Sequence, residues 1–153
     1  MKARIRLTSI SDLEQLSQLR CALWPESSVE EDKRKLAAIL SGNPGGNMPL
    51  DIYVAETEEG AVVGFLEIGL RSHADGCDTK VPVGFIEGWL VSENHRGQAI
   101  GAQLMAAAED WARNHGCVEM ASDTWIDNDL SQRVHEALGF EVVDRCVHYR
   151  KAL

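Results

Sequence analysis

The sequence predicts an α/β or α+β protein built on one mixed sheet with helices packed on its faces. Segments with the two-residue apolar period of strands lie on both sides of segments with the three- and four-residue spacing of helices. In chain order they run strand, helix, helix, three strands, helix, strand, helix, strand. Because the 153 residues contain no internal repeat and no linker-like tract, residues 1–153 are expected to form a single domain.

Capping and turn residues set the predicted helix boundaries. Ser11 and Glu14 form a capping-box pattern that begins one helix, and Pro25 ends it. Ser28 and Glu31 form a second capping box, which begins the next helix. We therefore expect strands over residues 3–7, 52–56, 61–70, 81–91, 117–124 and 140–150, and helices over about 12–24, 28–40, 100–115 and 131–138.

Composition and charge narrow the class of protein. With 15 Lys and Arg against 24 Asp and Glu, the net charge of −9 argues against nucleic-acid binding and suits a cationic small substrate. No apolar run approaches the ~18 residues of a membrane-spanning helix. The N-terminus alternates charged and apolar residues where a signal peptide is continuously apolar. A cytoplasmic protein with no membrane partner is therefore expected.

The cysteines give no sign of a metal or redox site. Four of them lie far apart and form no Cys-x-x-Cys pair, at Cys21, Cys77, Cys117 and Cys146. We expect reduced, mostly buried thiols and no bound metal.

The most informative segment joins an apolar strand to the helix that begins near Ile100. The run Arg96-Gly97-Gln98-Ala99-Ile100-Gly101 places small residues at a helix start. Several backbone N–H groups lack partners there, and the helix dipole adds partial positive charge. Such a start binds phosphate, although small-residue helix starts also occur for packing alone. The spacing matches neither the dinucleotide loop nor the nucleoside-triphosphate loop.

This segment resembles the acetyl-CoA-binding core of the GNAT superfamily of N-acetyltransferases. The resemblance covers about residues 81–145 and rests on Arg96-x-x-Ala99-x-Gly101, Asn128-x-x-Ser131 and Val134-His135-Glu136-Ala137-Leu138-Gly139-Phe140. It implies a mixed, mostly antiparallel central sheet flanked by about four helices, with acetyl-CoA as the cosubstrate.

Motifs along nearly the whole chain are also similar to aminoglycoside 6′-N-acetyltransferases. The similarity implies an enzyme that acetylates the 6′-amine of aminoglycoside antibiotics and so confers resistance. It also implies a homodimer. The motifs are Leu23-Trp24-Pro25, Gly76-Cys77-Asp78, Glu87-Gly88, Met120-Ala121-Ser122-Asp123-Thr124, His135-Glu136-Ala137-Leu138-Gly139-Phe140-Glu141 and Tyr149-Arg150-Lys151.

The resemblance also implies a set of acetyl-CoA-binding residues. Asn128 stands where the family has a cofactor contact, and it also suits the N-cap of the following helix. Ala99 replaces the family's usual glycine, which is tolerable if the backbone there is already helical. The pantetheine arm is expected to pair with the backbone of Trp89, Leu90 and Val91, and the pyrophosphate to contact Arg96, Gly97, Gln98, Ala99, Ile100, Gly101 and Ala102.

Two carboxylates are candidates for amine binding and proton removal. Glu87 lies inside an otherwise apolar strand, where an unpaired buried carboxylate is costly, although it could also face solvent. Asp123, at the end of the next strand, is the second carboxylate, with a turn role as the alternative. Two carboxylates on neighbouring strand ends can bind an ammonium group and share the removal of its proton.

The candidate acid for the leaving thiolate is Tyr149. It corresponds to the tyrosine that the family uses in this role, and a phenol can donate to a thiolate. His135 is a competitor by position, although a histidine on the inner face of a short helix is more often a packing residue.

The end of the first helix is the candidate substrate rim. Trp24 offers an aromatic plane for sugar C–H groups or cations, and an acidic run follows it. Most of those acids also suit an ordinary exposed helix start. Asp144 is a further substrate-binding candidate by resemblance.

The leading hypothesis is direct acetyl transfer in a ternary complex, because no cysteine lies in a recognisable nucleophile motif. One alternative is a GNAT acetyltransferase for another small amine or a protein N-terminus. The other is a non-catalytic acyl-CoA-binding module, against which Glu87, Asp123 and Tyr149 argue.

Overall fold

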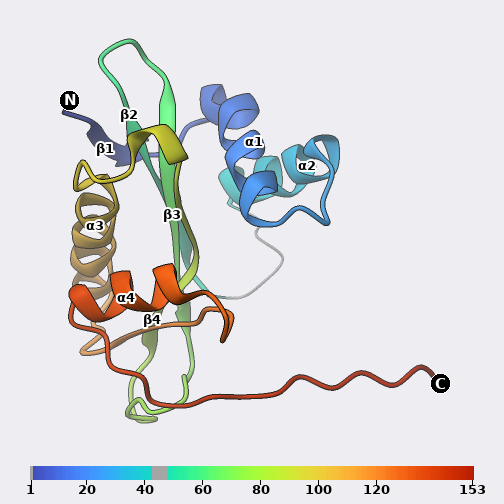
Figure 1. Cartoon of the computed structure of the whole chain (residues 1–153), viewed down its shortest axis with the longest axis vertical. Coiled ribbons are helices and arrows are strands. Elements are labelled where there is room, and N and C mark those ends of the chain that lie inside the picture. Colours follow the sequence, from blue (N-terminus) through green and yellow to red (C-terminus); the bar gives the residue numbers. More distant parts are fainter. Residues whose placement is uncertain (1, 43–47) are drawn as a thin grey trace.

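A five-stranded sheet forms the centre of the molecule (Figure 1). The computed structural model describes residues 2–42 and 48–153, and within them the strand order follows the chain order. The first four strands pair antiparallel and the last pair is parallel, so the mixed, mostly antiparallel sheet is confirmed. The strands are β1 (Arg4–Leu7), β2 (Leu50–Glu56), β3 (Val62–Arg71), β4 (Val83–Val91) and β5 (Met120–Ser122).

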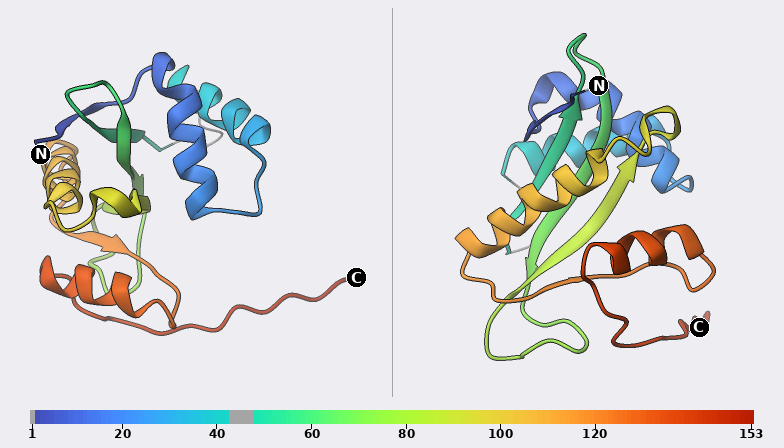
Figure 2. Two further views of the ribbon diagram at one scale, coloured as in Figure 1. Left: turned by 45° about the horizontal axis from the view of Figure 1, so that its top comes forward. Right: turned by 60° about the vertical axis from the view of Figure 1, so that its left-hand side comes forward.

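Helices cover both faces of this sheet (Figure 2). The first two lie on one face, the third lies on the other, and the fourth packs near the β4–β5 side. Two short 3₁₀ turns, Ile10–Asp12 and Glu93–His95, precede the first and third helices. The α-helices of the described residues are α1 (Leu13–Leu23), α2 (Val29–Leu40), α3 (Ile100–Asn114) and α4 (Asp129–Ala137).

Strand β3 divides the core into two halves. Phe65 points into the cluster that contains Leu16 of α1 and Leu36 of α2. Leu66, its neighbour, points into the cluster that contains Leu104 of α3. All five side chains are fully buried. Successive strand residues face opposite sides, so a strand covered on both faces is apolar throughout, as β3 is over most of its length.

The helix starts differ from the prediction at one place. Ser28 accepts a hydrogen bond from the Glu31 N–H at 3.1 Å, which confirms the second cap. The first predicted box is wrong. Asp12, not Glu14, receives the reciprocal bond, from the Ser9 N–H at 2.7 Å. The 3₁₀ turn before α1 moves the cap two residues earlier than the sequence pattern indicates. The predicted loop after α2 lies at residues 43–47 outside the described residues.

Strand β4 has a bulge on one side and a free edge on the other. Glu67 of β3 pairs with Gly88 and the next residue pairs with Ile86, so Glu87 is the extra residue of a β-bulge. On its other side β4 pairs with β5 only over Gly84–Ile86. The two strands diverge beyond that point, which leaves the outer edge of residues 87–91 open (Figure 2).

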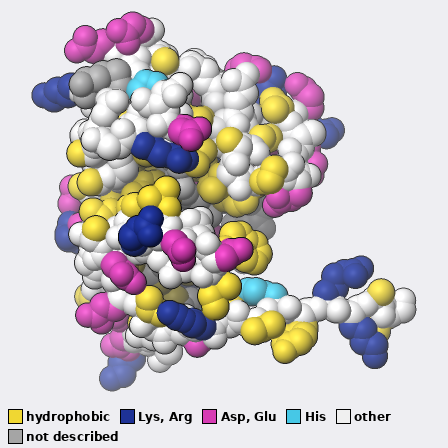
Figure 3. Space-filling model, in the orientation of Figure 1, with side chains coloured by type: hydrophobic (Ala, Val, Ile, Leu, Met, Phe, Trp, Pro, Cys, Tyr) yellow, Lys and Arg dark blue, Asp and Glu magenta, His cyan; other side chains and the backbone are white. Residues whose placement is uncertain are grey.

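The predicted last strand, 140–150, is wrong for the single chain. Residues 141–153, here named the C-terminal arm, have no regular secondary structure. The arm first passes the β3–β4 loop, where Val143 lies against Gly76, and its later part extends away from the body (Figure 1). Figure 3 shows apolar and basic side chains along the arm, and Tyr149 is 92% exposed. Strand periodicity predicts which face a side chain takes, but a strand also needs a neighbour to pair with.

The strand expected over 117–124 is also shorter, because only Met120–Ser122 pair with β4. The four cysteines form no disulfide, and their burial is mixed: Cys117 is buried, Cys21 and Cys77 are half-buried, and Cys146 is exposed. The expectation of mostly buried thiols is therefore wrong for Cys146. No helix among the described residues is long and apolar enough to cross a membrane.

Candidate active site

Glu87 is paired, so it is neither buried alone nor freely solvated. Its two oxygens accept hydrogen bonds from Nε and Nη2 of Arg71, each at 2.8 Å. Its side chain is 30% exposed. The bulge at β4 adds Glu87 to the strand face that also carries Phe85, toward α1. The carboxylate therefore lies on the sheet face covered by α1, at a point that solvent reaches.

Arg71 pairs with Glu87, one of the two candidate carboxylates. Its guanidinium lies over the Phe85 ring, 3.5 Å from the centroid. The hydrogen bond to Glu87, with the charges of Glu87 and Asp123, raises the pKa of Arg71. Asp123 is exposed just after β5. Among the described residues only Glu87 makes an ion pair with this cation, and Asp123 acts on it through its charge. Sequence reasoning missed Arg71, because only the β3–β4 register brings it to Phe85 and Glu87.

Trp24 lies directly against β4. A Cβ atom at Gly88 would lie 2.5 Å from the Trp24 ring, so only glycine lets the indole pack here. The ring also contacts Phe65, with centroids 6.1 Å apart. The Trp24 ring therefore lies over Gly88, the neighbour of Glu87 in β4, on the same face of the sheet. A hollow of about 290 Å³ opens beside it, lined by Arg20, Trp24, Glu26, Ser27, Asp32 and Lys35.

A buried ion cluster lies under this hollow. Arg20 donates from Nε to both oxygens of Asp32, at 3.1 and 3.0 Å, and from Nη1 to Glu67. Burial raises the pKa of Glu67, and the charge of Arg20 opposes that shift. Asp32, an acid of the predicted rim, is thus a buried partner of α1. The sequence signal for this cluster is a charged residue within an apolar stripe on each of three elements.

The start of α3 presents free amides to the open edge of β4. The helix begins at Ile100, and the N–H groups of its first turn have no partner within the helix. Ala99 and Gly97 precede it in left-handed conformations, with φ of 60° and 75°. The condition under which alanine is easily tolerated, right-handed helical backbone, is not met at Ala99, because the position has the conformation for which glycine is favoured. Three exposed residues, 97–99, leave the amides accessible.

Two further cofactor candidates take part in the local structure. Arg96 donates from Nε to the Val91 carbonyl at 3.1 Å, which ties the loop to the end of β4. Asn128 accepts from the Ser131 N–H at 3.1 Å, so its N-cap role is confirmed. Trp89 packs its ring 3.2 Å from the position of a Cβ at Gly101. The strand end and the helix start are thereby held together.

His135 has the contacts of a packing residue. Its Nε2 lies 2.8 Å from the Ser122 hydroxyl, and its Nδ1 lies 2.7 Å from the Ser131 carbonyl. The carbonyl can only accept, so Nδ1 carries the proton and Nε2 accepts from the serine. The ring also lies edge-on between Trp89 and Phe140.

The structure does not bring Tyr149 or Asp144 to the site within one chain. Both are exposed on the C-terminal arm, and Asp144 accepts a hydrogen bond only from the adjacent Arg145 N–H among the described contacts. Trp24 and Glu87 lie on the same face of β4, and Asp123 follows β5, the strand that pairs with β4. The candidate cofactor site is formed by the end of the same strand and the start of α3.

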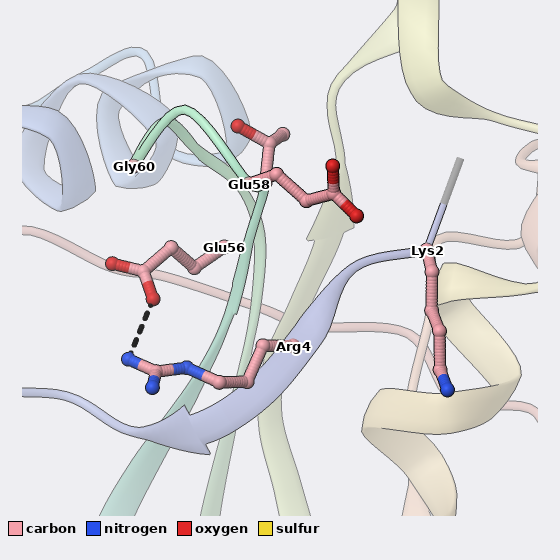
Figure 4. A pocket seen from close by; sticks show the side chains of 6 residues that line it. Lys2, Arg4, Glu56, Glu58 and Gly60 are labelled. Atoms are coloured by element: carbon pink, nitrogen blue, oxygen red, sulfur yellow. Dashed lines mark hydrogen bonds and ion pairs between the residues drawn. The ribbon is translucent and has the colours of Figure 1, made fainter.

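A second hollow, of about 380 Å³, lies beside β1 and has mixed charge (Figure 4). Two of its lining side chains, Arg4 and Glu56, form an ion pair with 2.8 Å between the guanidinium nitrogen and the carboxylate oxygen. Its lining is Lys2, Arg4, Glu56, Thr57, Glu58 and Gly60, with no pair of groups arranged for acyl transfer. Among residues 2–42 and 48–153, no group of three or more His, Cys, Asp or Glu side chains could hold a metal.

A diverging strand edge beside a free helix start is the arrangement of an acyl-CoA-dependent transferase. Residues 13–140 match the model of the acetyltransferase (GNAT) family, and the chain belongs to that family. The free amides of the α3 start and the open edge of residues 87–91 fit its cosubstrate, acetyl-CoA.

Two relatives that share one name match most of the chain. The aminoglycoside N(6′)-acetyltransferase type 1 of Klebsiella aerogenes is 36% identical over 149 residues, which cover 97% of this chain and 96% of the relative. The protein of that name from Serratia marcescens is 42% identical over 136 residues, covering 88% of this chain and 89% of the relative.

Solved structures agree with the fold. The structure of AAC(6′)-Iy in complex with the bisubstrate analog CoA-S-monomethyl-acetylneamine has a TM-score of 0.85 and 35% identity, and the match covers 100% of both chains. The aminoglycoside 6′-N-acetyltransferase AAC(6′)-Ih from Acinetobacter baumannii has a TM-score of 0.86 and 28% identity, with 99% of each chain covered.

Proposed function

We propose that this chain is an aminoglycoside 6′-N-acetyltransferase, in which the substrate amine attacks acetyl-CoA directly in a ternary complex. Relatives of that name match this chain over most of their length. The observation in this molecule that carries the proposal is the carboxylate of Glu87, which already holds a cation beside the open edge of β4, with the charge of Asp123 acting on the same cation. An ammonium group of a polycationic substrate suits that position.

Glu87 is the proposed base, and Asp123 is the proposed second carboxylate. The amine must be neutral to attack, so a carboxylate takes the proton of the bound ammonium, directly or through a water molecule. The backbone N–H of Leu90 or Val91 is the proposed donor to the oxyanion, because both lie on β4 beyond its last pair with β5.

The proposed cofactor contacts follow the same edge. Acetyl-CoA supplies the acetyl group as a thioester when bound. The backbone of residues 89–91 pairs with its pantetheine arm, and the amides of residues 97–102 hold its pyrophosphate. Arg96 adds positive charge at the start of this loop, where its Nε donates to the Val91 carbonyl.

The substrate rim is proposed to form around Trp24. The hollow beside it carries the carboxylates of Glu26 and Asp32 with an aromatic face, which suits sugar rings bearing several ammonium groups. Asp32 contributes its negative charge rather than a direct contact with the substrate, because it already accepts hydrogen bonds from Arg20.

The active unit is proposed to be a homodimer formed by exchange of the C-terminal arm. The arm carries exposed Val142, Val147 and Tyr149, and it runs away from its own chain. β5 is the last strand of the described sheet, so its outer edge is free to pair with another strand. An arm on the partner's β5 edge lies next to Asp123 of that copy. It supplies Tyr149, the proposed acid, to the partner's site.

The test of the proposed function is release of CoA thiol in the presence of acetyl-CoA and one of two polycations, kanamycin or spermidine. Release with kanamycin at a kcat/KM well above that with spermidine is the expected result. The reverse preference assigns the chain to another amine. No release with either, together with measurable acetyl-CoA binding, points to a binding module. The cytoplasmic location stays a prediction from the sequence.

A further inference from the structure

Arg71 fills a complete cation site. Its guanidinium donates one hydrogen bond of 2.8 Å to each oxygen of Glu87. The guanidinium carbon lies 3.5 Å from the centroid of the Phe85 ring, and Asp123 adds a second negative charge. A carboxylate pair and an aromatic face are the groups that recognise a free ammonium ion. The three charged groups carry one net negative charge, which attracts a further cation to this place.

The Arg71 side chain is free to leave this site. It is 44% exposed, and it stands at the last residue of β3, where the chain leaves the sheet. An ion pair at such exposure contributes up to about 1 kcal/mol, so a substrate that brings a cation and further contacts can break it. The neighbouring cation, Arg20, is different, because it is 7% exposed and bound between Asp32 and Glu67.

We propose that Arg71 is a specificity-determining residue that holds the place of the substrate ammonium and must be displaced by it. The proposal rests on the proposed function, since it concerns the amine that reacts there. Arg71 keeps Glu87 oriented in the free enzyme. It also excludes weakly bound cations from the site. A cation with few other contacts gains too little binding free energy to offset the loss of the bidentate pair and of the stacking on Phe85.

The Arg71→Gln variant tests this role. Glutamine keeps a polar side chain of moderate length but carries no charge, so nothing competes for the site. The dissociation constants of kanamycin and of spermidine, measured by calorimetry without acetyl-CoA, are expected to fall about fivefold. The kcat for kanamycin is expected to stay unchanged, because Arg71 has already left Glu87 when the substrate is bound. KM therefore decreases while kcat does not.

Two further variants separate this role from a general loss of structure. Arg71→Lys keeps the charge and is expected to bind both polycations with nearly wild-type affinity. Arg113→Gln removes an exposed arginine of α3 that also pairs with two acids, Glu109 and Asp110, and is expected to leave affinity and kcat unchanged.

The outcomes separate this proposal from the proposed function. One outcome is that Arg71→Gln binds spermidine and kanamycin more tightly while the wild type transfers no acetyl group. This outcome supports the role of Arg71 and rejects the proposed aminoglycoside activity. Transfer to kanamycin with unchanged or weaker polycation binding in Arg71→Gln overturns the proposal and keeps the function. Absence of polycation binding to either protein also overturns the proposal, because the emptied site must bind a cation.

Discussion

At the scale of single residues, one carboxylate joins the start of α1 to the edge of the sheet. Asp12 accepts hydrogen bonds from two nitrogens of Arg6, each at 2.8 Å, and from the Ser9 N–H at 2.7 Å. The bond from Arg6 lowers the pKa of Asp12 from 3.8 to about 2. Because the folded-state pKa is depressed, the resulting stability is present above about pH 4 and is lost as the pH falls toward 2.

Asp12→Asn is therefore expected to lower the free energy of unfolding by about 2 kcal/mol at pH 7. The difference from wild type is expected to shrink as the pH falls from 5 to 3, in urea unfolding at each pH. Asp110→Asn, at an exposed pair, is the control with little effect. A difference that stays constant with pH contradicts a role for the charge.

Ala99 is the other residue with a measurable consequence, because its φ of 60° is costly for any side chain with a Cβ atom. Ala99→Gly is expected to raise the free energy of unfolding by about 0.5–1 kcal/mol, after the entropy cost of glycine. Urea unfolding with an unchanged m-value measures it. Ala106→Gly, at an exposed position within α3, is the control and loses about 1 kcal/mol. Equal losses in both variants contradict strain at Ala99.

At the scale of elements, α1 depends on Gly88 for its place against β4. Gly88→Ala puts a methyl group 2.5 Å from the Trp24 ring, so it is expected to cost about 1–3 kcal/mol of stability and to raise KM for the aminoglycoside. Trp24→Phe removes the ring atoms that clash. In the double variant the added loss from Gly88→Ala is expected to be smaller than in the wild type, in thermal unfolding of all four proteins. Strict additivity contradicts the contact.

Element positions follow well from the sequence, but the pairings between them do not. Periodicity predicts the strands around Phe65 and the start of α3, since both depend on neighbours in the chain. The bulge at Glu87 and the contact with Arg71 depend on the register between two strands, which periodicity does not specify. The pairing of Glu87 with Asp123 stays a prediction, and the buried partners of Arg20 come from two other elements.

At the scale of the whole molecule, the C-terminal arm has strand periodicity but pairs with no strand among the described residues of its own chain. The proposed exchange of the arm between two copies would account for both facts, and it would make each site dependent on Tyr149 of the other copy. Glu87→Ala and Tyr149→Phe are each expected to reduce kcat strongly, and each with little change in acetyl-CoA binding.

Mixing these two variants after reversible unfolding tests the exchange. Half of the dimers are then mixed, and in each mixed dimer one of two sites has both Glu87 and a tyrosine from the partner, so about a quarter of wild-type activity returns. Sedimentation of the mixture checks the dimer. No recovery in a mixture that is dimeric shows that Tyr149 acts within its own chain or not at all.

The central claim is that the cation position between Glu87 and Asp123 takes the 6′-ammonium of an aminoglycoside. Release of CoA thiol from acetyl-CoA, measured with kanamycin and with its 6′-hydroxyl counterpart at equal concentration, tests it most directly. Release with the 6′-amine alone is the predicted result. Equal release with both compounds shows that another amine is acetylated and contradicts the claim.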